Sequence, residues 1–382
     1  MGLSILQVAS AFPHWGGTEL HILNLSEQLQ RRGHDVTVAC RPGGWVEARA
    51  HERGLPTVPV TVKRQQDWRD YGRLRDFLRS RRVDVLHVHW SLDIIVAGTA
   101  ALWQRVPVRV LSRHMPYPLN APVGVLLYSH LLYTRLVALS QSVADTLLGC
   151  GVRTKNLEVI HHGTDVEAFA QTALPVPEAR RALGIAPDRV AVGVIGRLSP
   201  EKGHAVLLQA ARELGDHSPV QYVIIGDGPD DAALRRQVET LGLQDRVLFT
   251  GFRADVNSAM AALDIVTLPS TWAEPCSAVV QQAMALSKPV IGTRAGGTPE
   301  MILDGVTGLL VPPSESGPLA EAIAALSADA DARERMGRAG RERVEALFSL
   351  RMMTDKIEAL YLRQYEQSLK PTSRRTSVMK GG

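Results

Sequence analysis

The chain has few of the features that secreted and membrane-spanning proteins need. It contains three scattered cysteines in 382 residues, an odd number without CxxC spacing. This argues against a disulfide framework and favours a reducing compartment. The longest apolar region, residues 123–139, is interrupted by polar residues and is too short to span a bilayer. The first apolar run, residues 3–9, lacks a charged leader and predicts a strand rather than a targeting segment. We expect a cytoplasmic protein, with the inner face of the cell membrane as an alternative location.

A large net charge is also missing, since the formal charge is +4. The excess is local, because residues 63–82 hold eight cations and three acids. Apolar residues recur there at helical spacing, which predicts an amphipathic helix packed on a sheet with a solvated basic face. The alternative is that Lys63–Arg82 docks on an anionic membrane. A nucleic-acid partner is not expected, because no nucleic-acid-binding motif accompanies the charge.

Short apolar runs alternate with helical stretches along almost the whole chain. This pattern predicts an α/β fold with doubly wound parallel sheets that are covered on both faces. A Pro-containing stretch of low periodicity near residue 175 interrupts the alternation, which then starts again. We therefore expect two domains that face each other across a cleft. The expected boundaries are a first domain (1–172), a linker (173–181), a second domain (182–350), a terminal helix (351–369) and a disordered tail (370–382).

The most informative segment is the loop at residues 196–203, which begins and ends with Gly196 and Gly203. An apolar run that predicts a buried strand precedes it, and a helical pattern follows. A helix start offers free backbone N–H groups and the positive end of the helix dipole. Arg197 adds a planar fork for phosphate oxygens, and Lys202 adds a point charge. Either an ordinary turn with two solvated cations or a diphosphate site fits this loop alone.

A second loop with polar groups follows the predicted strand at residues 265–268. It carries Glu274, and Ser277 is a candidate N-cap for the next predicted helix. Gln282 lies one or two turns into that helix. A carboxylate and an amide at such positions are suited to binding the hydroxyls of a sugar and a ribose.

Four motifs in this order resemble retaining glycosyltransferase family 4. Residues 196–203 match its G-x-L-x-x-x-K-G loop, and residues 225–229 resemble its next strand-end signature. The block from Glu274 to residue 291 is similar to its Glu, seven residues, Glu pattern, and residues 296–311 match its closing pattern. The chain departs from the pattern at Gln282, where the second Glu stands, at Ser277, where Gly is usual, and at the turn 285–289.

The resemblance implies a GT-B fold, with two Rossmann-like domains, a donor held mainly by the second domain, and a terminal helix that packs back on the first. Carried over by position, Arg197 and Lys202 hold the diphosphate of a nucleotide-sugar donor and Glu274 binds the transferred sugar. Gln282 takes the ribose, with donor binding weakened or altered by the change from Glu. The donor-binding set is Gly16, Gly17, Gly196, Cys276, Ser277, Ala278 and Gln282.

The first domain offers fewer signals. Gly16 and Gly17 lie between a predicted strand and helix, which permits close approach of backbone to a ligand. His114 follows another predicted strand and matches a family histidine that contacts the donor sugar. His87 and His89 share one face of a strand. Since no third ligand has suitable spacing, a buried His87 and a cleft-edge His89 are expected rather than a metal pair.

The interpretation is a retaining transferase that moves a sugar from a nucleotide diphosphate sugar to a carbohydrate or lipid-linked acceptor in cell-envelope polysaccharide, lipopolysaccharide or glycolipid synthesis. Arg197, Lys202, Glu274 and His114 form the catalytic set, and no metal or other cofactor is expected. The alternatives are a sugar-nucleotide epimerase on the same fold and a non-catalytic nucleotide-sugar-binding subunit. A nicotinamide dehydrogenase fits poorly, because the glycines at 226 and 228 lack the third Gly of its motif. The sugar, base, acceptor, linkage and oligomeric state are not encoded in any recognisable motif.

Overall fold

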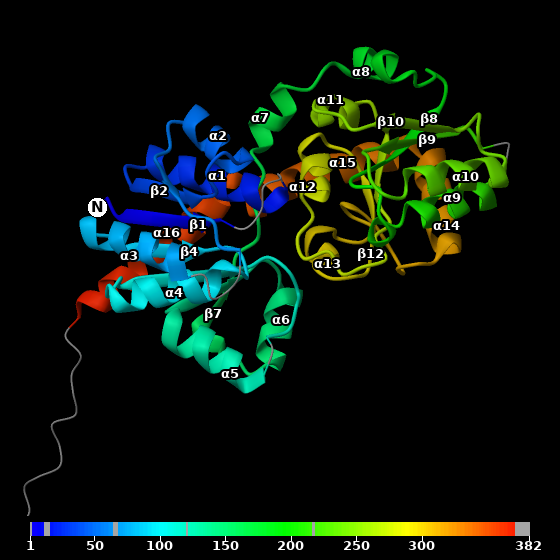
Figure 1. The fold of residues 1–382 in the computed structure, drawn as a ribbon. Helices are drawn as coiled ribbons and strands as arrows, with labels where there is room; N and C mark the ends of the chain where they lie inside the picture. Colours follow the sequence, from blue (N-terminus) through cyan, green and yellow to red (C-terminus); the bar gives the residue numbers. More distant parts are fainter. Residues whose placement is uncertain (1, 11–15, 64–67, 120, 216–217, 371–382) are drawn as a thin grey trace, which may run out of the picture.

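The computed structural model describes residues 2–10, 16–63, 68–119, 121–215 and 218–370. The expected tail therefore lies outside the described residues except for Lys370. The described chain forms two parallel sheets, each with helices on both faces (Figure 1). This is the predicted architecture of two doubly wound, Rossmann-like domains.

The first sheet has seven strands in the order β3-β2-β1-β4-β5-β6-β7. Six of them coincide with apolar runs of the sequence, whereas β3 at the edge is a three-residue strand without such a run. The bounds are β1 (Ser4–Ala9), β2 (Asp35–Cys40), β3 (Thr57–Pro59), β4 (Val85–Val88), β5 (Val108–Arg113), β6 (Arg135–Ala138) and β7 (Leu157–Val159).

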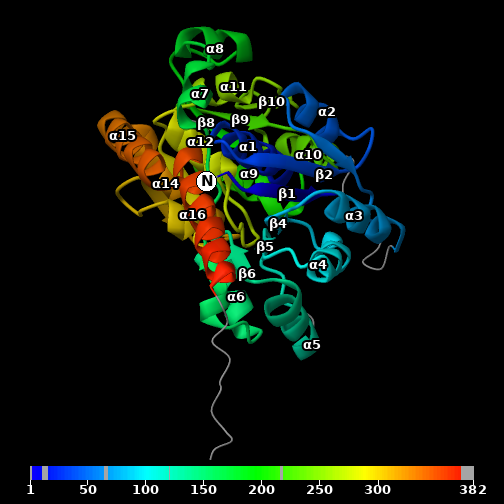
Figure 2. The same cartoon turned by 90° about the vertical axis from the view of Figure 1, so that its left-hand side faces the viewer.

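Two layers of helices bury the faces of this sheet. Apolar side chains of α3, α4, η1 and α6 pack on one face, and those of α1, α2 and α16 pack on the other. The bounds are α1 (Gly17–Arg31), α2 (Trp45–Glu52), α3 (Trp68–Ser80), α4 (Asp93–Trp103), α5 (Ala121–Leu126), η1 (Leu127–Leu132), α6 (Gln141–Gly149) and η2 (Thr154–Asn156). The last helix of the chain, α16 (Leu350–Leu369), thus packs back on the first domain as expected (Figure 2).

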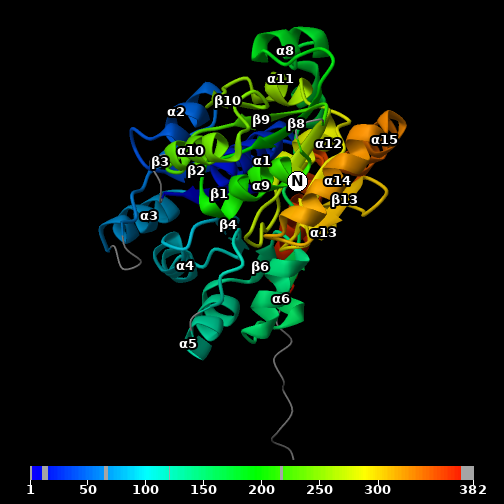
Figure 3. The ribbon, with the colours of Figure 1, turned by 90° about the vertical axis from the view of Figure 1, so that its right-hand side faces the viewer.

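The second sheet has six parallel strands in the order β10-β9-β8-β11-β12-β13. Its strands are β8 (Val190–Ile195), β9 (Val220–Ile225), β10 (Val247–Gly251), β11 (Ile265–Leu268), β12 (Val290–Thr293) and β13 (Gly308–Val311). Helices α9 (His204–Glu213), α10 (Asp231–Leu241) and α14 (Ser316–Ala328) cover the face turned toward the viewer in Figure 3. The opposite face is covered by α8 (Val176–Leu183), α11 (Val256–Ala261), α12 (Ala278–Ala285) and α15 (Ala330–Leu347).

The chain passes between the domains twice, and the two passages are hydrogen-bonded to each other. The first leads from β7 into α7 (Val166–Gln171), and the second leads from α15 into α16. Thr164 N donates to Phe348 O at 2.9 Å, and Leu350 N donates to Thr164 O at 2.8 Å. The expected linker at 173–181 contains the start of α8, because Pro175 is the N-cap residue of a helix there.

Candidate active site

In each sheet the strand order reverses beside its first strand, between β1 and β4 in one domain and between β8 and β11 in the other. Loops that follow strands at such a reversal separate from each other and leave room for a ligand. The loop with Arg197 and Lys202 follows β8, and the loop with Glu274 follows β11. Gly16 and His89 follow β1 and β4. The sequence motifs therefore lie at the two positions where a doubly wound sheet binds its ligand.

The loop after β8 is held by backbone hydrogen bonds to its neighbour after β9. Gly196 N donates to Ile225 O at 3.0 Å, and Leu198 N donates to Asp227 O at 2.8 Å. A 3-10 turn, η3 (Pro200–Lys202), then leads to Gly203 at the start of α9. Because the loop is fixed along its length, its side chains project from a rigid support.

The structure brings Lys202 and Glu274 of the second domain together. Lys202 Nζ contacts Glu274 Oε1, which also accepts a hydrogen bond from Ser270 Oγ at 3.1 Å. The side chain of Lys202 passes close to Gly196, and Arg197 is exposed beside them. A cation of the kind that suits phosphate oxygens and a carboxylate of the kind that suits hydroxyl groups thus lie in direct contact.

Two glycines make this arrangement possible. Gly203 has φ +71°, and a Cβ there would lie 1.8 Å from Pro269 O in the Glu274 loop. A Cβ on Gly226 would lie 1.9 Å from Gly196 O. Both distances are far shorter than any van der Waals contact. The loops after β8, β9 and β11 are therefore packed backbone against backbone.

The helix after Glu274 only partly follows the sequence prediction. Ser277 is the N-cap residue of α12, as predicted, but its side chain makes no capping hydrogen bond. The neighbouring Cys276 is buried, and burial raises the pKa of its thiol to about 12. Ala278 is the first residue of the helix, and Gln282 is half-buried in it. Cys276, Ser277 and Ala278 thus lie at the start of α12, and Gln282 lies one turn further along it.

Gln281, which sequence reasoning missed, connects the two domains. Its side chain is 1% exposed. Its Nε2 donates to His162 O at 2.9 Å, and its Oε1 accepts from Thr164 Oγ1 at 2.9 Å. The sequence does place Gln281 beside Gln282 in the predicted helix, and adjacent residues of a helix point in different directions. The sequence alone does not say which of two adjacent amides is buried.

The first domain contributes a cluster of five histidines, of which His21, His87, His89 and His114 are buried and His162 is half-buried. They come from α1, β4, the ends of β4 and β5, and the first passage between the domains. The rings of His21 and His162 are stacked, with centroids 4.1 Å apart. Burial lowers the pKa of all five, to about 3 for His87 and about 4 for His162. The imidazoles are therefore neutral at pH 7.

Neutral rings allow a consistent assignment of their protons. His89 Nε2 lies 2.8 Å from Gln7 Oε1, an atom that only accepts, so this nitrogen must carry the proton. His89 Nδ1 then accepts from His114 Nε2 at 3.1 Å, and His114 Nδ1 accepts from His162 Nε2 at 3.2 Å. Both ring nitrogens of His114 are thus engaged. Its contact with a donor sugar, implied by the family pattern, would replace one of these hydrogen bonds.

His87 is buried and fully hydrogen-bonded, as predicted. Its Nδ1 is hydrogen-bonded to the Tyr361 hydroxyl of α16 at 2.5 Å, and its Nε2 is hydrogen-bonded to Ser112 Oγ at 2.8 Å. His89 was expected at a cleft edge, but it is 3% exposed and lines a small pocket. The expectation was wrong about exposure because the neighbouring strands and α1 supply other histidines that cover the ring.

Comparison with known proteins identifies the family of this chain. Residues 15–168 match the family model for Glycosyltransferase Family 4, and residues 175–343 match that for Glycosyl transferases group 1. A D-inositol 3-phosphate glycosyltransferase from Corynebacterium jeikeium is 30% identical over 360 residues, which cover 84% of this chain and 86% of that protein. The chain belongs to the group 1 glycosyl transferases.

One further relative and one solved structure are similar to this glycosyltransferase. The lipopolysaccharide core biosynthesis glycosyltransferase LpsD of Rhizobium meliloti is 28% identical, over 89% of this chain and 93% of that protein. The crystal structure of Anabaena Alr3699/HepE in complex with UDP has the same fold, with a TM-score of 0.83 and 24% identity. The match covers 94% of this chain and 100% of that chain. The GT-B fold expected from the motifs is therefore confirmed.

A buried carboxylate of this glycosyltransferase, Glu19, was not foreseen. It lies in the first turn of α1, just after Gly16 and Gly17, and is 4% exposed. Burial raises its pKa, while a hydrogen bond with Trp90 acts against that shift. Glu19 joins the glycine pair to the end of β4. The G-G-T-E sequence contains it, but a glutamate in a first helical turn is equally typical of an exposed helix start.

Three remaining features of the glycosyltransferase concern metal and membrane. Among the described residues, no cluster of three or more His, Cys, Asp or Glu side chains has the geometry to hold a metal ion. Asp329, the first residue of a D-x-D sequence, caps α15 by accepting from Ala332 N at 2.8 Å. Within the same part of the chain, no helix is long and apolar enough to cross a membrane.

The basic segment 63–82 forms α3 over residues Trp68–Ser80, with Leu74 and Leu78 buried against the sheet. The amphipathic helix is thus confirmed, although residues 64–67 lie outside the described residues. Trp68 is 71% exposed. Four of the arginines pair with acids: Arg73 with Asp70, Arg75 with Asp76, Arg81 with Asp35 and Arg82 with Asp84. The uncompensated positive charge of this surface is smaller than the sequence suggests.

Proposed function

We propose that this glycosyltransferase is a retaining, metal-independent enzyme that moves a hexosyl group from a nucleotide diphosphate sugar to an acceptor hydroxyl. The contact between Lys202 and Glu274 carries the proposal. In a nucleotide diphosphate sugar the diphosphate is bonded directly to the sugar. A site for such a donor therefore needs a cation for the diphosphate close to hydrogen-bond acceptors for the sugar hydroxyls. The Anabaena protein of the same fold is in complex with UDP, which supports a donor of this class.

In the proposed reaction, the bond between the anomeric carbon and the phosphate oxygen breaks while the acceptor oxygen bonds to the same face of the sugar. The acceptor proton passes to the leaving phosphate oxygen, so that a glycoside and a nucleoside diphosphate result. Arg197, Lys202 and the start of α9 stabilise the charge that grows on the phosphate. Glu274 binds sugar hydroxyls, Gln282 binds the ribose, and the backbone at Cys276, Ser277 and Ala278 lies against the sugar and phosphate.

We place the enzyme in the assembly of cell-envelope polysaccharide, lipopolysaccharide or glycolipid. The Rhizobium relative is named for lipopolysaccharide core biosynthesis, and the Corynebacterium relative is named for an inositol phosphate. Both names fit a carbohydrate acceptor. They leave the acceptor and the linkage of this enzyme open.

Substitution of Lys202 tests the proposal directly. Lys202→Ala should lower transfer about a hundredfold or more, because a preplaced cation at the leaving group is lost. Transfer is measured as nucleoside diphosphate released from UDP-glucose and GDP-mannose with a panel of sugar acceptors. The matched control is Arg235→Ala, which removes an exposed, ion-paired cation of the same domain. Unchanged transfer in Lys202→Ala would contradict the proposal.

The same assay separates the alternatives. A transferase releases nucleotide only when an acceptor is present. An epimerase converts the donor without acceptor, and a non-catalytic subunit is stabilised against heat by UDP or GDP but releases nothing.

We also propose peripheral contact with anionic membranes through α3, at the cytoplasmic face. Trp68 supplies an exposed aromatic ring beside the basic face of the helix. Trp68→Ser should weaken sedimentation with vesicles of phosphatidylglycerol and phosphatidylcholine, whereas Trp103→Ser should not. Trp103 is a suitable control because it is 72% exposed at the end of α4. Equal sedimentation of both variants with the unmodified protein would remove the membrane contact from the proposal.

A further inference from the structure

Arg113 is a deeply buried cation of the first domain. It is the last residue of β5 and is 8% exposed. Its Nη2 donates to Tyr117 O at 2.8 Å, and its Nε is buried without a hydrogen-bond partner. Among the described residues, no carboxylate forms an ion pair with it. Burial of a charge without compensation is strongly unfavourable in general, so Arg113 is a costly residue to hold in this place.

Three other arginines with buried or half-buried side chains make different contacts. Arg109, four residues earlier on the same strand, donates to the carbonyl oxygens of Leu132 and Val106, both at 2.7 Å. Arg180 pairs with Asp264 at 2.8 Å. Arg246 is as deeply buried as Arg113 and also has guanidinium nitrogens without a hydrogen-bond partner, but its guanidinium lies over the Tyr222 ring. Arg113 differs from these three arginines because it lines a pocket.

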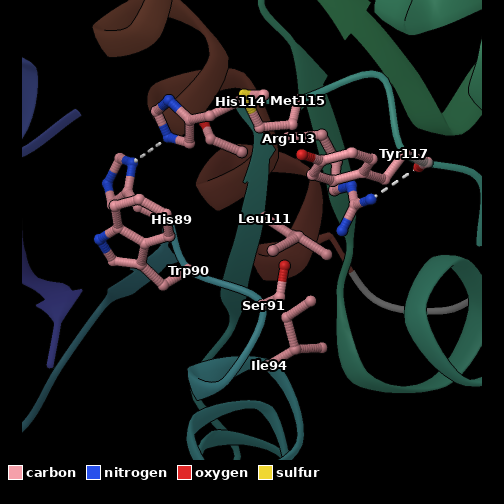
Figure 4. A pocket seen from close by; sticks show the side chains of 10 residues that line it. His89, Trp90, Ser91, Ile94, Leu111, Arg113, His114, Met115 and Tyr117 are labelled. Atoms are coloured by element: carbon pink, nitrogen blue, oxygen red, sulfur yellow. Dashed lines mark hydrogen bonds between the residues drawn. The ribbon is translucent and has the colours of Figure 1, made fainter. Parts of the chain in front are cut away.

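Arg113 lines a pocket of about 70 Å³ that contains no acid. In Figure 4, Arg113 and Tyr117 lie on the side of the pocket opposite His89 and Trp90. The remaining wall is mostly apolar, with Ile94, Leu111 and Met115 among its residues. Both histidines of the wall, His89 and His114, are neutral because burial lowers their pKa. Arg113 therefore supplies the charge of a pocket with room for one compact anionic group.

The pocket adjoins the proposed donor site. His114 follows Arg113 directly, and Tyr117 meets Trp272 of the second domain with ring centroids 6.4 Å apart. Trp272 lies two residues before Glu274 in the loop after β11. The loop that carries Glu274 thus contacts Tyr117, one of the residues that line the pocket.

We propose that this pocket binds a phosphate or carboxylate group of the acceptor, with Arg113 as its counter-ion. The inference rests on the proposed transfer reaction, because it assigns the pocket to the second substrate. It predicts that the enzyme prefers an acidic acceptor over its uncharged analogue. A sugar phosphate and a uronic acid carry the two groups that fit.

Calorimetric titration of the full chain with glucose 6-phosphate, glucuronate and glucose tests the proposal without turnover. Either or both of the acidic sugars should bind at least about tenfold more tightly than glucose, since hydrogen bonds to charged groups are stronger than those between neutral groups. Arg113→Gln should remove this advantage, and Arg113→Lys should retain part of it. Arg109→Gln is the control, because Arg109 lies on the same strand outside the pocket lining. Which acid is preferred identifies the group.

Two results would overturn the proposal. One is equal binding of glucose and both acids by the unmodified protein, which decides the question even if Arg113→Gln fails to fold. The other is a folded Arg113→Gln variant that keeps the preference for acids, which would leave Arg113 with the structural task of holding the Tyr117 carbonyl. Failure of the donor proposal is distinguishable, because the unmodified protein would then gain no thermal stability from UDP or GDP, whatever happens at Arg113.

Discussion

The two domains contribute chemically different groups to the candidate site. The first uses a cluster of neutral histidines: four of them form hydrogen bonds with one another or with Gln7, Ser112 and Tyr361, and His21 stacks on His162 without a hydrogen-bond partner. The second uses backbone packed through glycines, on which a few charged side chains stand. Uncharged donors and acceptors suit hydroxyl groups, whereas fixed cations beside helix starts suit phosphates. The histidine cluster therefore suits hydroxyl groups and the loops of the second domain suit phosphates, and Arg113 is an exception that places a buried charge in the first domain.

The largest expected effect comes from breaking the backbone packing of the second domain. Gly203→Ala should destabilise the protein by roughly 3 kcal/mol or more, since the new Cβ would meet Pro269 O at 1.8 Å. Gly242→Ala is a matched control, because Gly242 has φ +69° but a Cβ there would meet no atom within 4 Å. It should cost about 1 kcal/mol, the usual penalty when a residue with a Cβ adopts the left-handed conformation. Urea unfolding measures both, and equal costs would mean that the loops can separate freely.

The histidine side of the comparison predicts acid sensitivity. The folded-state pKa values of these histidines lie below the unfolded value of 6.5, at about 3 for His87 and about 4 for His162. The unfolded chain therefore binds more protons between pH 6.5 and about 4. The contribution of these histidines to the free energy of unfolding is fully present above pH 6.5. It falls as the pH drops, by about 1.4 kcal/mol per pH unit for each proton that the unfolded chain binds in excess of the folded one. Asp93 opposes this in part, because burial raises its pKa to about 6.

Urea unfolding at pH 7.5, 6 and 5 measures this slope. His162→Asn, which replaces the imidazole by an amide that does not titrate, should make the slope shallower. His51→Asn should leave it unchanged, because His51 is exposed on α2. Stability that stays constant from pH 7.5 to 5, or equal slopes in the two variants, would show that the cluster takes up protons without unfolding.

The smallest expected effect is on donor binding by the second domain, through substitution of Gln282. Gln282→Glu restores a charged acceptor for ribose hydroxyls, and charge-assisted hydrogen bonds are stronger than neutral ones. The KM for the donor should fall a few-fold, by about 1 kcal/mol in binding, with kcat nearly unchanged. Gln237→Glu, on α10, is the control. A change in kcat with constant KM would indicate that residue 282 acts on the reacting sugar instead.

The sequence predicts the second domain better than the first. Its strands are short apolar runs, and its candidate site residues lie in loops directly after strands, so local patterns are enough to nominate Arg197, Lys202 and Glu274. The proximity of Lys202 and Glu274 also follows, because β8 and β11 are neighbours at the reversal of strand order. What local patterns miss is the side-chain orientation on α12, where Gln281 rather than Gln282 is buried between the domains.

The first domain's site is assembled from distant parts of the chain. His21, His87, His114 and His162 lie on separate elements, and the hydroxyl that binds His87 comes from Tyr361 near the end of the chain. Each histidine alone resembles an incidental residue, and only the tertiary structure gathers them. Arg113 was overlooked for the same reason, since a strand-end arginine usually reaches solvent and its burial depends on the turn that brings Tyr117 over it.

The return of α16 has a consequence for how the protein could be divided. A fragment cut after β7 would lose the wall that Leu350, Ile357 and Tyr361 give to the first sheet. Grafting residues 350–369 directly behind residue 165 would follow the existing hydrogen bonds between Thr164 and Leu350. Such a rewired half should fold unaided and leave its neighbour as a contiguous piece, so that the two substrates could be studied on separate polypeptides.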